Sequence, residues 1–299
     1  MNRQVPVLIT WDIDPYSRHN LAKKRRALQT AMELCQELEI PATFFFVAQE
    51  AKWYPEEIAQ MRRVGHEIGC HGLTHGSEEE YNRMPSEMQR SYIEQATRLL
   101  DEKTGALITS FRGPRVKTSP TTLRLLADYG YLADSSVCSQ RLDLVSSNLI
   151  NTGWLVAPRS SYHPHTDSAF RRGDLDILEV PVSALLIPFI SSALYVLRLS
   201  MMKVLFSLLY AEACRKNKPI VYLGHPAEFG PQSYSRRLKL SNLSPRTLYT
   251  HGLRFRKCLF ESDGEVRLSL SRALFSYMAT FSGVCFMTMQ EYALRKVTH

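Results

Sequence analysis

Residues 65–75 read Gly-His-Glu-Ile-Gly-Cys-His-Gly-Leu-Thr-His. The first six residues predict a short buried strand that places His71 at its end. His71 and His75 lie four residues apart, so both imidazoles can bind one divalent metal ion whether the segment is a helical turn or a loop. Such a pair is also common without a metal, and a third ligand from elsewhere is needed. Asp14 is the candidate, because two histidines and one carboxylate leave a coordination position open for water.

Apolar runs of the same kind recur along the chain and alternate with segments of helical spacing. This alternation predicts parallel βα units. The number of runs predicts an α/β fold, a distorted or incomplete (β/α) barrel with seven or eight parallel strands. Residues 1–299 would form a single barrel domain, with irregular insertions at about 138–176 and 236–272. We expect strands at 5–11, 42–47, 65–70, 107–111, 131–133, 177–182, 220–223 and 284–288, and helices at 22–39, 56–64, 84–103, 121–129 and from 290.

Polar residues stand at the ends of several predicted strands, where (β/α) barrels carry their active sites. Asp12 and Asp14 end the first strand and point to the same side of it. A metal would take Asp14, which would leave Asp12 free as a general base. Arg112 follows a second strand and, beside Asp12, would hold that carboxylate ionised. Taken alone, each of these residues also fits an ordinary turn or surface position.

Two further strands end in residues suited to acid–base chemistry. His225 lies in Leu-Gly-His-Pro after a very apolar strand, and an imidazole that titrates near neutrality can protonate a leaving amine. Asp134 follows another strand and could orient a histidine, or it could cap a helix. His163 and His165 could also bind metal, but they lie in an irregular segment, and a two-histidine cluster alone is a weak motif.

The chain carries an excess of positive charge, with a net charge of +8 and a sequence pI of about 9.2. The excess is grouped, as in residues 23–26, 171–172, 236–237 and 254–257. Such groups are usually solvated helix faces, but they also attract phospholipid headgroups or lipid-linked sugar phosphates. No nucleic-acid-binding fold signature accompanies them, so we expect no nucleic-acid partner.

Six widely scattered cysteines predict reduced, buried thiols. The start of the chain shows no secretory signal pattern. We therefore expect the protein in the cytoplasm or at the inner membrane surface. Residues 180–210 are strongly apolar, and three alternatives stay open for them: a buried strand with a core helix, a helix dipping into a bilayer interface, or a membrane span.

The order of the motifs Asp-x-Asp, His-x-x-x-His, Arg-x-Pro and Leu-Gly-His-Pro resembles the polysaccharide deacetylase family, carbohydrate esterase family four. The resemblance covers most of 5–229 and the final strand at 283–291. It implies a distorted, partly open barrel and one divalent metal ion, usually zinc. By resemblance Asp14, His71 and His75 would be metal ligands, Asp12 the base, Arg112 its brace, and His225 the general acid.

The chain departs from the common family pattern at three places. Ile13 separates the two aspartates, and Val116 replaces a glycine that often ends the third motif. The acidic partner of the last histidine is not clearly placed. Asp134 is our choice, with Asp176 or Glu179 as alternatives.

The resemblance implies a hydrolase that acts on linear amide C–N bonds. It would remove an N-acyl group, acetyl or formyl, from an amino sugar in a glycan or a lipid-linked saccharide. A peripheral membrane contact would fit the second kind of substrate. Two other functions stay open: a metal-dependent amidase on a non-sugar small molecule, and a non-catalytic glycan- or membrane-binding protein on a degenerate barrel.

Overall fold

A curled sheet of parallel strands forms the centre of the computed structural model, which describes residues 4–15, 20–140, 153–230 and 263–297. The strand order is β11-β1-β2-β3-β4-β5-β8, and every pairing along this path is parallel. The strands are β1 (Val5–Ile13), β2 (Ala42–Phe46), β3 (Glu67–Cys70), β4 (Ser110–Phe111), β5 (Ala133–Asp134), β8 (Leu178–Glu179) and β11 (Ile220–Gly224). Among the described strands β8 and β11 do not pair, which leaves the barrel incomplete. The predicted fold class is therefore confirmed.

The last predicted strand lies beside the start of the first. β12 (Val284–Phe286) pairs in parallel with residues 5–7 of β1. The predicted strands at 107–111 and 177–182 are much shorter in the structure than expected, because chain segments that look apolar in the sequence lie partly outside the ladder. Leu107, for example, is 79 % exposed.

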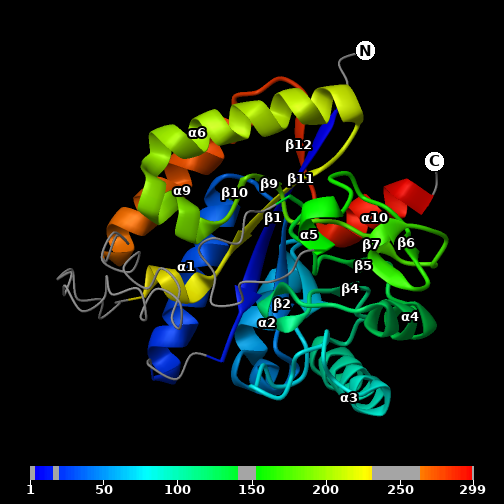
Figure 1. Ribbon diagram of the computed structural model, residues 1–299. Coiled ribbons are helices and arrows are strands. Elements are labelled where there is room, and N and C mark those ends of the chain that lie inside the picture. The colour runs from blue at the N-terminus through cyan, green and yellow to red at the C-terminus, as the bar shows by residue number, and fades with distance from the viewer. Residues whose placement is uncertain (1–3, 16–19, 141–152, 231–262, 298–299) are drawn as a thin grey trace, which may run out of the picture.

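Helices surround the sheet (Figure 1). They are α1 (Leu21–Glu37), α2 (Pro55–Arg63), α3 (Ser86–Thr104), α4 (Pro120–Asp128), α6 (Ser191–Lys216), α9 (Gly264–Ala279) and α10 (Met289–Val297), with a short α5 (Gly153–Val156). Local sequence explains their starts. The side chain of Asn20 accepts a hydrogen bond from the backbone N–H of Lys23 and caps α1. Ser119 and Thr122 form a capping box at the start of α4.

The core is formed by the apolar residues of the central strands. Trp11 of β1 and Phe44, Phe45 and Phe46 of β2 are fully buried. Tyr222 of β11 packs edge-on against Trp11 with ring centroids 6.5 Å apart. Burial on both faces explains why these strands read as nearly continuous apolar runs.

Both predicted insertions lie partly outside the described residues, at 141–152 and 231–262. The described remainder of the first contains α5 and a hairpin of β6 (Pro164–His165) and β7 (Ser168–Arg172). Residues 264–272 of the second form the first half of α9, which packs against α6. Three 3₁₀ turns, η1 (Ala48–Trp53), η2 (Pro114–Val116) and η3 (Pro226–Phe229), complete the loops.

The apolar stretch at 180–210 forms a small hairpin, β9 (Ala184–Leu185) with β10 (Ile187–Pro188), and then α6. By length and composition α6 is long and apolar enough to cross a membrane. One side of α6 packs into the core, since Leu194, Met202 and Phe206 are buried. Arg198 interrupts the helix with a φ of 71°. The regular part that follows is therefore shorter than a typical span, about 27 Å at 1.5 Å per residue.

Candidate metal centre and active site

The residues singled out in the sequence come together at the C-terminal ends of four strands. Asp14 follows β1, His71 follows β3, Arg112 follows β4, and His225 follows β11. Asp12 is the second-to-last residue of β1. Because the strands are parallel, their ends share one edge of the barrel, and side chains far apart in sequence become neighbours there.

Three side chains form a candidate metal site. One ligand atom each from Asp14, His71 and His75 lies within 4.8 Å of the others. Asp14 Oδ1 is 3.2 Å from His71 Nε2 and 3.5 Å from His75 Nε2. Burial opposes ionisation of Asp14, but the three surrounding imidazoles outweigh it and hold the pKa of this carboxyl well below its usual range.

The tautomer of His71 tests whether these residues fit a cation. His71 Nδ1 lies 2.7 Å from the backbone carbonyl of Arg112, which can only accept, so Nδ1 carries the proton. Nε2 faces Asp14 Oδ1 at 3.2 Å, and this buried oxygen has no other polar partner among the described residues. Two acceptor atoms at 3.2 Å need a cation between them. In the metal-free protein a proton on Nε2 supplies it, since Asp12 and Asp14 outweigh burial and raise the pKa of His71; a metal ion bound by the same atoms would replace that proton. The donor set thus fits a divalent metal ion.

Glu79, which sequence reasoning missed, organises the loop that carries His75. Its buried carboxylate accepts hydrogen bonds from the backbone N–H groups of Leu73, Thr74 and His75, each at 2.7 Å. The hydroxyl of Tyr81 donates to it at 3.0 Å. These bonds hold His75 in a left-handed conformation, with a φ of 58°, that a non-glycine residue rarely adopts without support.

Arg112 braces Asp12 as expected. Its Nη1 donates to Asp12 Oδ1 at 2.9 Å and to Thr10 Oγ1 at 2.8 Å. The remaining guanidinium donors bind the carbonyl and hydroxyl oxygens of Ser135. Arg112 is fully buried and Asp12 nearly so. The second carboxylate oxygen of Asp12 lies 3.9 Å from His71 Nε2 and so faces the metal ligands.

His225 lies on the open side of the cluster and is 34 % exposed. Its Nε2 is 3.9 Å from Asp14 Oδ2, and its Nδ1 is 3.8 Å from Glu228 Oε1. Burial lowers the pKa of His225, but the charges of Glu228, Asp14 and Asp12 outweigh this and raise it above its ordinary value. The protonated imidazolium, the form that can donate a proton, is thereby favoured.

Asp134, expected to orient His225, has other partners in the structure. It accepts a hydrogen bond from Ser136 Oγ at 2.5 Å and lies opposite Glu179 in the β5–β8 ladder. Burial raises the pKa of both acids, that of Asp134 to about 6. The acid beside His225 is Glu228 instead, three residues along the chain in η3. Asp176 is exposed, and Glu179 is held by Asp134, so neither alternative replaces it.

The second histidine pair lies apart from this cluster. His163 Nδ1 bonds to the carbonyl of Leu175, and His165 lies beside Asp167 in the β6–β7 hairpin. Within the described ranges, Asp14 with His71 and His75 is the one group with the spacing for a metal ion.

Comparisons with known proteins find similarity to polysaccharide deacetylases. A family model described as polysaccharide deacetylase matches residues 2–133, which include the first three motifs. A peptidoglycan deacetylase from Helicobacter pylori is 26 % identical over 106 residues, which are 36 % of this chain and 35 % of the relative. The match thus spans about a third of the length of that curated relative.

Solved structures share the fold over the whole chain. A protein of Mycobacterium smegmatis described as a "putative polysaccharide deacetylase" superposes with a TM-score of 0.66 at 17 % identity, over 100 % of this chain and 92 % of the other. The allantoinase Puue gives a TM-score of 0.63 at 16 % identity, with the same coverage. At such identities the likeness shows the fold and not the reaction.

Proposed function

Starting from the confirmed resemblance to the polysaccharide deacetylase family, we propose that this chain is a metal-dependent hydrolase that removes an N-acyl group from an amino sugar in a glycan. The observation that carries the proposal is the cluster of Asp14, His71 and His75, with ligand atoms within 4.8 Å of one another, beside an acid–base pair made of Asp12 and His225. A glycan-binding protein would need neither the cation nor the two proton-transfer groups.

Asp14, His71 and His75 would hold the metal, and zinc suits a ligand set of two imidazoles and one carboxylate. When bound, a divalent ion of this kind lowers the pKa of water and polarises an acyl carbonyl. The Nδ1–H bond from His71 to the Arg112 carbonyl fixes the imidazole in the orientation that such a ligand requires.

The chain's own residues divide the proton transfers between them. Asp12, oriented by its hydrogen bond from Arg112, takes a proton from the attacking water through the oxygen that faces the metal ligands. The water oxygen adds to the acyl carbon, and the C–N bond of the amide breaks. His225 gives its proton to the departing nitrogen, and Glu228 stabilises the charged imidazole. The products are a free amine on the sugar and a carboxylic acid.

A lysine at the mouth of the site supports a substrate with an anionic group. A narrow crevice beside the cluster is lined by Asp12, Asp14, Lys23 and Lys24. In the basic run at 23–26, Lys24 pairs with Glu50, and the two arginines pair with other glutamates. Lys23 is exposed and has no ion pair in the part of the chain that the structure describes. Its charge is thus available to a phosphate or carboxylate on the sugar.

The substrate can be tested with a matched pair, an N-acetylated amino sugar with and without a phosphate group. Lys23→Ala should lower kcat/KM on the phosphorylated substrate about fivefold, as expected for one solvent-exposed charge contact of roughly 1 kcal/mol. It should leave the neutral substrate unchanged. Lys52→Ala, at an exposed lysine outside the crevice, is the control. Equal losses on both substrates would contradict the anionic preference.

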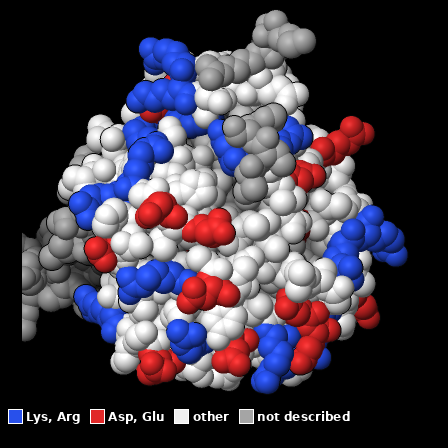
Figure 2. Space-filling model, turned by 90° about the vertical axis from the view of Figure 1, so that its right-hand side faces the viewer, with Lys and Arg blue, Asp and Glu red and all other residues white. Residues whose placement is uncertain are grey.

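The outer face of α6 supports a lipid-linked form of that substrate. Met201, Val204 and Leu208 lie on one side of the helix and are each at least half exposed. α6 itself carries Lys203, Arg215 and Lys216. Figure 2 shows Lys and Arg side chains over the upper part of one face as well as elsewhere on it. An apolar ridge near positive charge suits contact with an anionic bilayer, where apolar area and charge attraction add.

Vesicle binding tests this contact. Val204→Glu should reduce sedimentation with anionic liposomes, whereas Leu155→Glu, at an equally exposed apolar residue in α5, should not. Equal liposome binding by the two variants would contradict the proposal of a lipid-linked substrate. With a lipid-linked substrate we also place the protein at the cytoplasmic face of the inner membrane, which its free, buried Cys35 and Cys70 suit.

The proposed reaction itself is tested by acyl release. The wild-type protein loaded with zinc should release acetate or formate from an N-acylated amino sugar, and Asp12→Asn should abolish this without loss of bound metal. Release from simple amides but from no amino sugar would instead assign the site to a small-molecule amidase. An absence of release from either class would favour a binding protein.

A further inference from the structure

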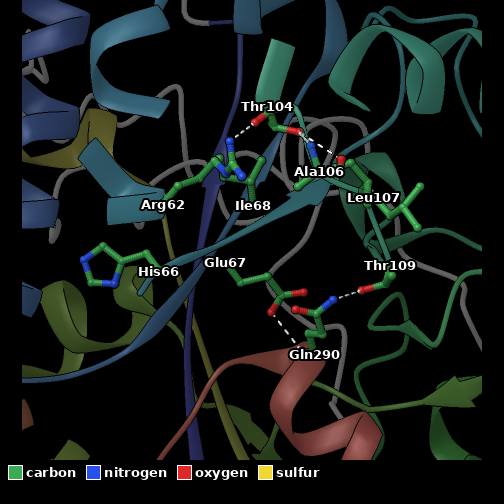
Figure 3. A pocket seen from close by; sticks show the side chains of 10 residues that line it. Arg62, His66, Glu67, Ile68, Thr104, Ala106, Leu107, Thr109 and Gln290 are labelled. Atoms are coloured by element: carbon green, nitrogen blue, oxygen red, sulfur yellow. Dashed lines mark hydrogen bonds between the residues drawn. The ribbon is translucent and has the colours of Figure 1, made fainter. Parts of the chain in front are cut away.

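A second cavity lies at the opposite end of the barrel, where β3 and β4 begin. It has a volume of about 190 Å³ and is framed by the ends of α2 and α3 and the start of α10 (Figure 3). That volume equals about six water molecules at roughly 30 Å³ each, enough for a small organic molecule. The residues that decide its chemistry are Arg62, Glu67, Ile68, Leu107, Thr109 and Gln290.

The inner end of the cavity holds a carboxylate with an unused oxygen. Glu67 is 9 % exposed. Its Oε2 accepts hydrogen bonds from the hydroxyl of Thr43 at 2.8 Å and from the backbone N–H of Gln290 at 2.9 Å. Its Oε1 is buried and has no hydrogen bond among the described residues. Burial raises the pKa of Glu67, and the hydrogen bonds to it offset this only in part.

The other polar groups nearby donate no hydrogen bond to Glu67 Oε1. The side-chain NH₂ of Gln290 donates one of its two hydrogens to Thr109 Oγ1 at 2.9 Å, and the other makes no hydrogen bond to Glu67 Oε1. Figure 3 shows the Gln290 side chain next to the Glu67 carboxylate. The buried hydroxyl of Ser110 also lies beside Glu67 and likewise lacks a hydrogen bond of normal geometry in the described residues. The inner end therefore offers an ammonium group two oxygen acceptors, Glu67 Oε1 and Ser110 Oγ. An unpartnered buried acceptor costs about 1–3 kcal/mol, which a ligand donor would recover.

The mouth of the cavity has the opposite character. Arg62 is exposed there and donates to the carbonyl of Thr104 at the C-terminal end of α3. It makes no ion pair with any acid in the described ranges, so its guanidinium can also bind an anion. Ile68 and Leu107 add apolar surface between the two polar ends.

We propose that this cavity binds a small zwitterion of the size of an α-amino acid. The ammonium group of the ligand donates to Glu67 Oε1, its carboxylate lies against Arg62, and its body packs between Ile68 and Leu107. The site is separate from the metal centre, since Glu67 begins β3 whereas His71 follows the end of that strand. Nothing in the inference depends on the proposed hydrolase activity.

Three probes of similar size separate the two charges. L-Alanine carries both groups, propionate lacks the ammonium, and ethylamine lacks the carboxylate. Calorimetric titration of the full chain, stripped of metal so that L-alanine cannot bind through a metal ion, should show saturable binding of L-alanine. Propionate and ethylamine should each bind at least about tenfold more weakly, because each loses one charge-assisted contact.

Variants at the two ends of the cavity locate the binding. Glu67→Gln should weaken L-alanine binding at least about tenfold. Leu107→Trp should abolish L-alanine binding by filling the mouth of the cavity. Because Leu107 is 79 % exposed, this variant should fold even if Glu67→Gln does not. Leu155→Trp, at an exposed leucine outside the cavity, is the control. Absence of binding to the wild type, equal binding of the three probes, or unchanged binding in Leu107→Trp would overturn the proposal.

Discussion

Replacing Glu79 by glutamine should loosen the metal site without touching a metal ligand. The Glu79 carboxylate is fully buried and accepts three backbone N–H groups, from Leu73, Thr74 and His75. An amide of the same shape has one acceptor oxygen, and its NH₂ group must face donors on the other side. At least one backbone N–H therefore loses its partner, at a cost of about 1–3 kcal/mol.

That cost falls on the loop in which His75 is held at a φ of 58°. A loss of 1–3 kcal/mol in the loop that presents one ligand corresponds to a metal affinity lower by roughly 5- to 150-fold, which includes the range typical for groups that orient ligands. Competition against a chelator of known affinity measures this directly. Chemical denaturation of the metal-free protein, run in parallel, gives the same cost as a change in the free energy of unfolding.

The adjacent glutamate provides the control. Glu78 is exposed, and its carboxylate contacts only the hydroxyl of Thr74, at 3.2 Å, among the hydrogen bonds that the structure describes. Glu78→Gln should therefore bind metal like the wild type. Unchanged affinity in Glu79→Gln, or an equal loss in both variants, would refute the assignment of Glu79 as the residue that positions this loop.

Two other perturbations follow from buried charges. Arg112→Met should leave the buried Asp12 carboxylate without its partner and lower the free energy of unfolding by about 3–5 kcal/mol, measured by urea denaturation; a loss below about 1 kcal/mol would show that the pair is dispensable. Burial raises the pKa of Asp134 from its ordinary value of 3.8 to about 6, so the folded state holds this proton more tightly than the unfolded chain. The stabilisation from this group should be complete below about pH 4 and be lost, by at most about 3 kcal/mol, as the pH rises through about 6. Asp134→Asn should flatten this fall, and an unchanged profile would contradict the raised pKa of Asp134.

Much of the fold was predictable because its signals are local. Buried parallel strands read as apolar runs, and the alternation with helices fixed the class. Asp12, Asp14, His71, Arg112 and His225 were also predictable as a group, since each follows a strand and parallel strands end at one edge. Strand length was less predictable, because Leu107 is apolar but lies outside the β4 ladder.

The missed features depend on which of several similar side chains turns inward. Asp134 lies at the end of a strand, much as Asp14 does, but its neighbour across the ladder is Glu179, and the two carboxyl groups contact each other. Glu78 and Glu79 are adjacent and chemically identical, and only the turn after His75 decides that Glu79 is the buried one. The partner of His225 is Glu228, which lies three residues further along the chain in η3 and not at the end of another strand.

Bound metal per chain tests the central claim most directly. Elemental analysis of the purified protein, with His71→Ala and Asp14→Ala measured alongside, should give about one divalent ion per wild-type chain. Both variants should lose it, because each removes one of the three residues whose ligand atoms lie within 4.8 Å of one another. Wild-type protein without metal after reconstitution, or variants that retain it, would contradict the account.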